Sequence, residues 1–170
     1  PQEMRAIRGR EVGMILQDPM TSLNPLFTVG NQMVETLRLH PGKMLRGLRE
    51  RAIELLEQVK IASPEVRLRD YPHQMSGGMR QRVVGAIAIT GTAKVLIADE
   101  TTNTLNGSIQ YQYLQLLKGI QRKAGVAIIF ITNDFGVVAK MCDRVAVMYA
   151  GKGVESADTR NLFNTPSHPY

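Results

Sequence analysis

Short apolar runs alternate along this chain with longer segments in which apolar residues recur every three or four positions. The short runs have the length of buried strands, whereas the longer segments have the period of amphipathic helices. The runs predict strands over Val12–Leu16, Lys94–Ala98, Val126–Ile131, Arg144–Ala150 and Lys152–Ser156. The periodic segments predict helices over residues 29–39, 44–60, 76–89, 108–123 and 135–142. Strands that alternate with helices predict an α/β fold with a mostly parallel sheet covered on both faces.

Prolines divide this pattern into parts. Proline lacks a backbone N–H and biases the preceding residue away from helix, so prolines between periodic segments predict loops. We therefore expect loops around Pro19 and Pro25 and between Pro64 and Pro72. Helices dominate the segment between the first two strands. The expected organisation is a helical subdomain at 29–89, an α/β core at 10–18 and 90–157, and a C-terminal extension at 158–170.

Composition limits where the protein works. The 170 residues, 44% of them apolar, fit one domain with a sizeable core. Cys142 is the only cysteine, which excludes an internal disulfide and fits a reducing cytosol. The longest strongly apolar run, Val126–Ile131, is far shorter than the ~18 residues of a membrane span. The first residues lack the apolar core of a signal peptide, so we expect any membrane role to come through a partner.

The formal net charge of +6 raises the possibility of a nucleic-acid partner. The basic residues are spread along the chain, however, and only 5% of the residues are aromatic, with no tryptophan. Proteins that bind single-stranded nucleic acid stack bases on aromatic side chains. We interpret the basic residues as a solvated face and expect no nucleic-acid partner.

The string His-Gln-Met-Ser-Gly-Gly-Met-Arg-Gln-Arg, at residues 73–82, opens one of the predicted helices. Its glycines, Gly77 and Gly78, let a phosphate approach the backbone closely, and the first N–H groups of a helix are unpaired donors. Ser76 can cap the helix or bond a phosphate oxygen. Taken alone, the Ser-Gly-Gly triplet is equally typical of a plain turn or cap.

Two carboxylates, Asp99 and Glu100, follow directly on the apolar run that ends at Ala98. Carboxylates at a strand end can hold Mg²⁺ and orient a water molecule for attack on phosphate. A lone Asp-Glu pair would more simply end a strand and cap the next helix. Gln17 ends the first predicted strand and is followed by Asp-Pro-Met-Thr-Ser-Leu-Asn-Pro.

Together these strings resemble the ATP-binding subunits of ABC transporters. The residues between the strings resemble the branch of the family that imports peptides or nickel. The resemblance extends to the closing His-Pro-Tyr at 168–170 and covers essentially the whole chain. It implies a P-loop-type α/β nucleotide-binding domain with an inserted helical subdomain. It also implies that the N-terminal part of that domain is missing here, because no G-x-x-x-x-G-K-[ST] string occurs in the sequence.

The resemblance implies roles for the site residues. Residues 73–82 match the family signature, with Met75 where leucine is usual, and the signature contacts the γ-phosphate of ATP bound by the opposite subunit. The implied cofactor-binding residues are Ser76, Gly77, Gly78 and Gln81. Asp99 would hold Mg²⁺, Glu100 would be the catalytic base, and Gln17 would sense Mg²⁺ and water. Asn133 stands where the family has its switch histidine.

The resemblance also implies partners and a location. These are a second ABC ATPase subunit in a homo- or heterodimer, transmembrane permease subunits that dock after Gln17, and indirectly an extracytoplasmic substrate-binding protein. The chain would then lie in the cytoplasm, on the inner face of the plasma membrane.

Three departures bear on activity: the absent phosphate loop, Asn106 in place of an aspartate, and Asn133 in place of the histidine. Asparagine is neutral and shorter than histidine, and loss of one transition-state donor costs roughly 10²–10³ in rate. We therefore expect an ATPase subunit that hydrolyses ATP negligibly as this chain alone. The alternative is a non-catalytic degenerate subunit, or a decayed fragment, that can only lend its signature to a partner ATPase.

Overall fold

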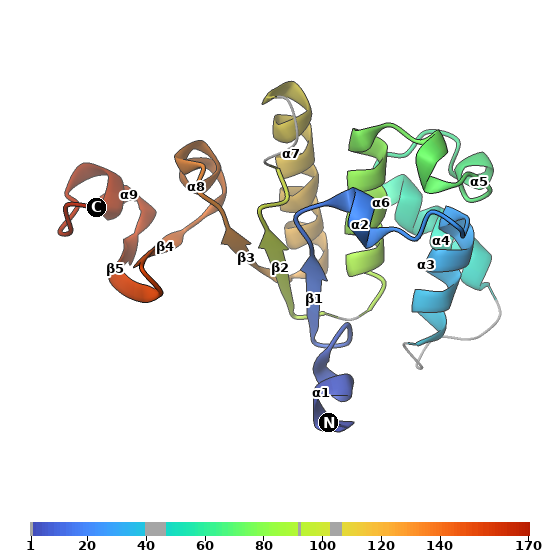
Figure 1. Cartoon of the computed structure of the whole chain (residues 1–170), viewed down its shortest axis with the longest axis horizontal. Helices are drawn as coiled ribbons and strands as arrows, with labels where there is room; N and C mark the ends of the chain where they lie inside the picture. Colours follow the sequence, from blue (N-terminus) through green and yellow to red (C-terminus); the bar gives the residue numbers. More distant parts are fainter. Residues whose placement is uncertain (1, 40–46, 92, 103–106) are drawn as a thin grey trace. The chain divides into compact units, whose positions relative to one another are not determined.

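The computed structural model describes residues 2–39, 47–91, 93–102 and 107–170 (Figure 1). The chain divides into two compact units, Pro1–Ile131 and Thr132–Tyr170, and each is considered by itself. The boundary between them lies inside the segment 90–157 that the sequence assigns to the α/β core. Within the described residues, no helix combines the length and the apolar character needed to cross a bilayer.

The first unit contains the helices and strands predicted from the periodicity, with ends that shift by a few residues. Its elements are α1 (Gln2–Ile7), β1 (Val12–Ile15), α2 (Pro19–Ser22), α3 (Val29–Arg38), α4 (Leu48–Gln58), α5 (Pro64–Arg67), the 3₁₀ turn η1 (Pro72–Gln74), α6 (Gly77–Ala88), β2 (Val95–Asp99), α7 (Gly107–Ala124) and β3 (Ala127–Ile131).

The two loops predicted from prolines are wrong in part, because each holds a short helix. Pro19 begins α2 and Pro64 begins α5. Proline suits the first turn of a helix, where its missing N–H would have no partner in any case. In α2 the hydroxyls of Thr21 and Ser22 donate to the Asp18 carbonyl at 3.0 and 2.8 Å, which closes that single turn.

The sheet of the first unit is parallel, in the order β1-β2-β3. Its register places Ile15 beside Ala98 and Met14 beside Ile97, so alternate residues face opposite sides. On the Ile15 side α6 packs close to β1, since a Cβ on Gly13 would lie 2.6 Å from the Ala88 carbonyl oxygen. On the other side Met14 is exposed. Within the first unit taken by itself, helices therefore cover the Ile15 side of the sheet and leave the Met14 side open.

The helical part of the first unit packs around α3, α4 and α6. The first turn of α3 is fixed by two backbone hydrogen bonds, from the Val29 N–H to the Asp70 carbonyl and from the Gly30 N–H to the Leu68 carbonyl, at 2.9 and 2.8 Å. Gly30 must be small, because a Cβ there would lie 2.7 Å from the Leu68 oxygen. The fully buried apolar side chains of these helices include Val29, Met33, Ala52, Leu55, Leu56, Val83 and Ala86.

The second unit is a helix-flanked hairpin. Its elements are α8 (Phe135–Met141), β4 (Arg144–Tyr149), β5 (Lys152–Asp158) and α9 (Thr159–Asn164). The sequence predicts both strands, and the structure pairs them antiparallel through a turn at Ala150 and Gly151, both at positive φ. The chain end folds back on β5, because the Glu155 carboxylate accepts the backbone N–H groups of Ser167 and His168 at 2.9 and 2.8 Å.

Candidate functional site

The carboxyl ends of β1 and β2 meet at one edge of the sheet, because the two strands are parallel neighbours. Gln17 follows β1 by two residues and Glu100 directly follows β2. The Gln17 side-chain amide donates to a Glu100 carboxylate oxygen at 2.5 Å, which joins positions 83 residues apart in the chain. Ligand sites of parallel α/β sheets form outside this edge. The structure therefore brings together two of the residues singled out from the sequence.

The backbone of Glu100 is held in an unusual conformation. Its φ of 44° lies in the left-handed region, which non-glycine residues seldom adopt. Its N–H donates to the Ile131 carbonyl at the end of β3, at 2.8 Å. Backbone strain of this kind persists where the surroundings fix it, and it is concentrated at functional sites. The Glu100 side chain thus starts from a defined backbone position at the sheet edge.

Asp99 is the last residue of β2 and lies partly buried beside Ile131 in the register of β3. Among the described residues, no group of three or more His, Cys, Asp or Glu side chains could hold a metal ion. Mg²⁺ does not need such a group, since it is usually bound by one or two carboxylates together with water and substrate phosphates. The Asp99-Glu100 pair fits that kind of shared site.

The exposed glycine turn stands at the start of α6. Ser76 is the N-cap, and its hydroxyl accepts the Met79 N–H at 3.3 Å. Gly77 is exposed, with no atom within 4 Å of the place a Cβ would occupy. Gly78 is tighter, because a Cβ there would lie 3.3 Å from an Ile109 methyl group. The first turn of this 12-residue helix can therefore receive an anion at its backbone N–H groups.

Gln81 lies in the same helix but points into the protein. Its side chain is fully buried and its amide donates to the Thr101 carbonyl at 2.7 Å. It also lies beside the phenol of Tyr113, whose pKa is raised by burial, an effect that the nearby Gln81 partly offsets. The Gln81 carbonyl oxygen and the phenol oxygen are buried without a partner of good hydrogen-bond geometry. The structure does not place the Gln81 side chain with the exposed signature residues.

This interior contact was not predicted from the sequence. Thr101 and Thr102 are buried directly after Glu100, and Gln110 of α7 donates to the Thr102 hydroxyl at 3.3 Å. The available signal was the polar Gln81, which lies in the same helix as the apolar residues Val83, Val84 and Ala86. A buried polar group requires a partner. That partner is a backbone carbonyl, which no side-chain pattern reveals.

The proposed switch position lies in the second unit. Asp134 caps α8 by accepting the N–H groups of Gly136 and Val137 at 2.7 and 3.3 Å, and its own N–H donates to the Thr132 hydroxyl. Asn133 is exposed in this turn. Asn106 lies outside the described residues.

Comparison with known proteins gives a consistent result. The family model described as ABC transporter matches residues 1–103. The chain is 53% identical over 169 residues to the oligopeptide transport ATP-binding protein OppD of Bacillus subtilis, covering 99% of this chain and 47% of that protein. It is 51% identical to the dipeptide transport ATP-binding protein DppD of the same species, covering 99% and 50%. The chain thus spans about half the length of these relatives.

Solved structures agree with the fold. The ATP-binding cassette MJ0796, in a dimeric post-hydrolysis state bound to ADP and phosphate, matches with a TM-score of 0.79 and 25% sequence identity. The match covers 94% of this chain and 67% of that one. The family model matches more than half of this chain. The same chain has the parallel sheet, the glycine turn that opens α6 and the carboxylate pair at the end of β2. The chain belongs to the ABC transporter family.

Proposed function

We propose that this chain is part of the ATP-binding subunit of an ABC importer and couples ATP hydrolysis to the uptake of peptides. The names of the similar proteins support the cargo class, since they include oligopeptide and dipeptide transport ATP-binding proteins. Nickel, the other cargo suggested by the sequence, finds no counterpart among those names. The remaining partners follow from this role: a second ATPase subunit, a permease in the membrane, and a location at its cytoplasmic face.

The observation that carries the proposal is the hydrogen bond between Gln17 and Glu100. It joins an amide and a carboxylate at the edge of a parallel sheet where substrates bind. In this role Glu100 accepts a proton from, or orients, the attacking water, and Gln17 fixes the Glu100 carboxylate. Asp99 would hold Mg²⁺, which supplies charge neutralisation at the ATP phosphates.

The start of α6 has a different role in the proposal. Ser76, Gly77 and Gly78 present hydroxyl and N–H groups to the γ-phosphate of ATP held by the partner subunit. The Gln81 side chain is assigned a positioning role, since its amide is used by the Thr101 carbonyl. Gln81 thereby links the signature helix to the residue that follows Glu100.

A hybrid protein tests the main proposal. The matching half of Bacillus subtilis OppD is replaced by this chain, and peptide uptake and ATP hydrolysis are measured in cells and in membranes. We expect the hybrid to retain peptide uptake and its Glu100→Gln variant to lose it. A hybrid that assembles and binds ATP but neither hydrolyses it nor imports peptide overturns the proposal. Glu57→Gln, on the surface of α4, is a matched control that leaves uptake unchanged.

The second candidate is a non-catalytic subunit that only lends its signature to a partner ATPase. The observation in its favour is Asn133, a neutral side chain exposed in the turn before α8. In the hybrid, Asn133→His should raise hydrolysis by up to roughly 10²-fold if the position acts as the switch. The second candidate would be selected by a different result. In that case the chain stimulates ATP hydrolysis by an intact partner, Ser76→Arg removes the stimulation, and no hydrolysis depends on Glu100. Purified chain alone should show negligible turnover.

A further inference from the structure

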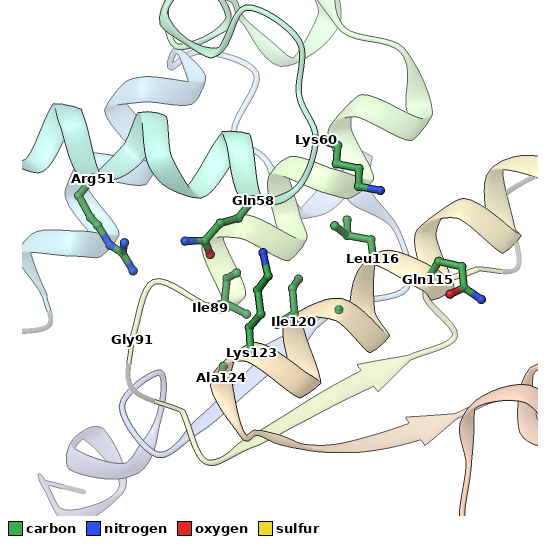
Figure 2. A pocket seen from close by; sticks show the side chains of 11 residues that line it. Arg51, Gln58, Lys60, Ile89, Gly91, Gln115, Leu116, Ile120, Lys123 and Ala124 are labelled. Atoms are coloured by element: carbon green, nitrogen blue, oxygen red, sulfur yellow. The ribbon is translucent and has the colours of Figure 1, made fainter.

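A pocket of about 450 Å³ lies in the first unit, between α4, the segment after α6 and the C-terminal half of α7 (Figure 2). It adjoins Ile89 at the far end of α6 from Ser76, about 20 Å along the helix axis. Pockets of this volume are in the range that holds small ligands. It is therefore separate from the proposed nucleotide site.

The polar lining of this pocket is basic. Arg51, Lys60 and Lys123 contribute to the wall, and none of the lining residues is acidic. A guanidinium nitrogen of Arg51 contacts Glu54 at 2.6 Å, but its buried Nε has no hydrogen-bond partner. In the part of the chain that the structure describes, neither lysine side chain has an ion-pair partner. Two ammonium groups of the pocket wall are thus available to an anion, and the Arg51 guanidinium adds positive charge beside them.

The floor of the pocket is apolar. Ile89, Leu116 and Ile120 line it, and Figure 2 shows Lys123 extending beside Ile89 and Ile120 toward Gln58. Gly119 adds space, because no atom lies within 4 Å of the place a Cβ would occupy there. A ligand that fills this space therefore meets hydrocarbon below and positive charge at the rim.

We propose that this pocket binds a small organic anion, a phosphate or carboxylate attached to an apolar body. The cations select the anionic group, and the floor selects the body. A free peptide or amino acid fits poorly, because its ammonium group would find no carboxylate among the lining residues. The bound anion would contact both α4 and α7, and by mass action it would stabilise the arrangement of these two helices.

Titration of the whole chain with phenyl phosphate, followed by backbone NMR, tests the proposal. Phenyl phosphate should bind at least tenfold more tightly than inorganic phosphate or phenol, because each of these offers only half of the interaction. The largest chemical shift changes should fall at Gly91, Gly119 and Ile120. Equal binding of inorganic phosphate overturns the proposal, as do changes centred on Gly77 and Gly78.

Two variants sharpen this test. Gly119→Leu fills the open space while it improves helix propensity, so it should abolish binding without unfolding the chain. Lys123→Glu should weaken binding at least tenfold, whereas Arg122→Glu, the same charge change at an exposed neighbour outside the lining, should change it less than threefold. Undiminished binding by folded Gly119→Leu overturns the proposal.

A phospholipid also carries a phosphate on an apolar body, so it could occupy the same pocket through its headgroup. The chain could bind phosphatidylglycerol vesicles but not phenyl phosphate, and Lys123→Glu could remove the vesicle binding. That result would show that the pocket takes a membrane lipid in place of a free anion, and it would overturn the proposal. None of these measurements depends on ATP hydrolysis, so they can fail while the proposed function holds.

Discussion

The two faces of the parallel sheet differ in what covers them. On one face Ile15 and Leu96 are fully buried, and α6 lies so close that Gly13 has no room for a side chain. On the other face Met14 is 46% exposed and Ile129 is 52% exposed. The residues themselves are equally apolar on the two faces. Burial here depends on the neighbouring helices and not on the strand sequence.

This difference has a physical meaning. Parallel strands that read as continuous apolar runs are typical of sheets covered on both faces. Within the first unit taken by itself only one face has a cover, so Met14, Ile129 and Ile131 form an exposed apolar surface. Contiguous surfaces of this kind mark contact sites or a risk of association. The covered face should therefore set the stability of the unit, whereas the open face should set its association.

The sharpest test of the comparison removes one large side chain from each face. Leu96→Ala leaves a cavity under α6 and α7 and should lower the free energy of unfolding by about 2–5 kcal/mol. Ile129→Ala removes a side chain that is half exposed and should cost under about 1 kcal/mol. Urea unfolding of both variants measures the two values. Equal losses would mean that both faces are buried in solution.

The next test adds atoms where the helix lies closest. Gly13→Ala forces β1 and α6 apart at the Ala88 carbonyl and should destabilise the chain by about 1–3 kcal/mol. Met14→Ala, one residue on and on the open face, is the matched control and should cost less than about 1 kcal/mol. Thermal unfolding compares the two. A neutral Gly13→Ala would contradict the close packing of α6 on β1.

A third test addresses the polar contact on the covered side. Gln81→Leu leaves the buried Thr101 carbonyl without its donor and should cost about 1–3 kcal/mol. Gln115→Leu, on the exposed surface of α7, should cost less than about 0.5 kcal/mol. Hydrogen exchange at residues 100–102 should quicken in the first variant alone. Unchanged exchange there would show that Gln81 does not hold this segment.

The smallest effect is expected in the second unit, taken by itself. Backbone N–H groups of Ser167 and His168 lower the pKa of Glu155 from its ordinary value of 4.5. A lowered folded-state pKa means that the contact is complete above 4.5 and is lost as the pH falls through the lower value. The backbone amide signal of Ser167 should therefore change in acid, below pH 4.5. Glu155→Gln should show the acid-like Ser167 signal already at neutral pH, and an acid transition of this signal that persists in Glu155→Gln would contradict this origin.

The sequence was a good guide where periodicity and motif agreed. The 3.6-residue period predicted α6 and α7 within two residues of their ends. Gln17 and Glu100, which the resemblance assigned to the site separately, meet in the structure because parallel neighbours end at one edge. Proline at the start of α2 and α5 was misleading, since the same residue opens a helix as readily as it ends one.

Two features could not be read from the sequence. The open face could not, because strand composition does not say which neighbours are present. The burial of Gln81 could not either, because its partner is a main-chain oxygen that carries no residue-type signal. The motif places Gln81 in the helix α6, as the structure does, but it does not give the direction of the side chain. That direction depends on how α6 packs on the residues after β2.

The Gln81 contact also bears on which substitutions the chain can accept. Because the acceptor is a carbonyl that every residue has, position 101 can change to another small side chain without loss of this hydrogen bond. Position 81 has no such freedom, since a side-chain amide donor must reach the same point from α6. Genetic variation should therefore accumulate unequally at the two ends of one hydrogen bond, and a library randomised at both positions should enrich glutamine at 81 and a range of residues at 101.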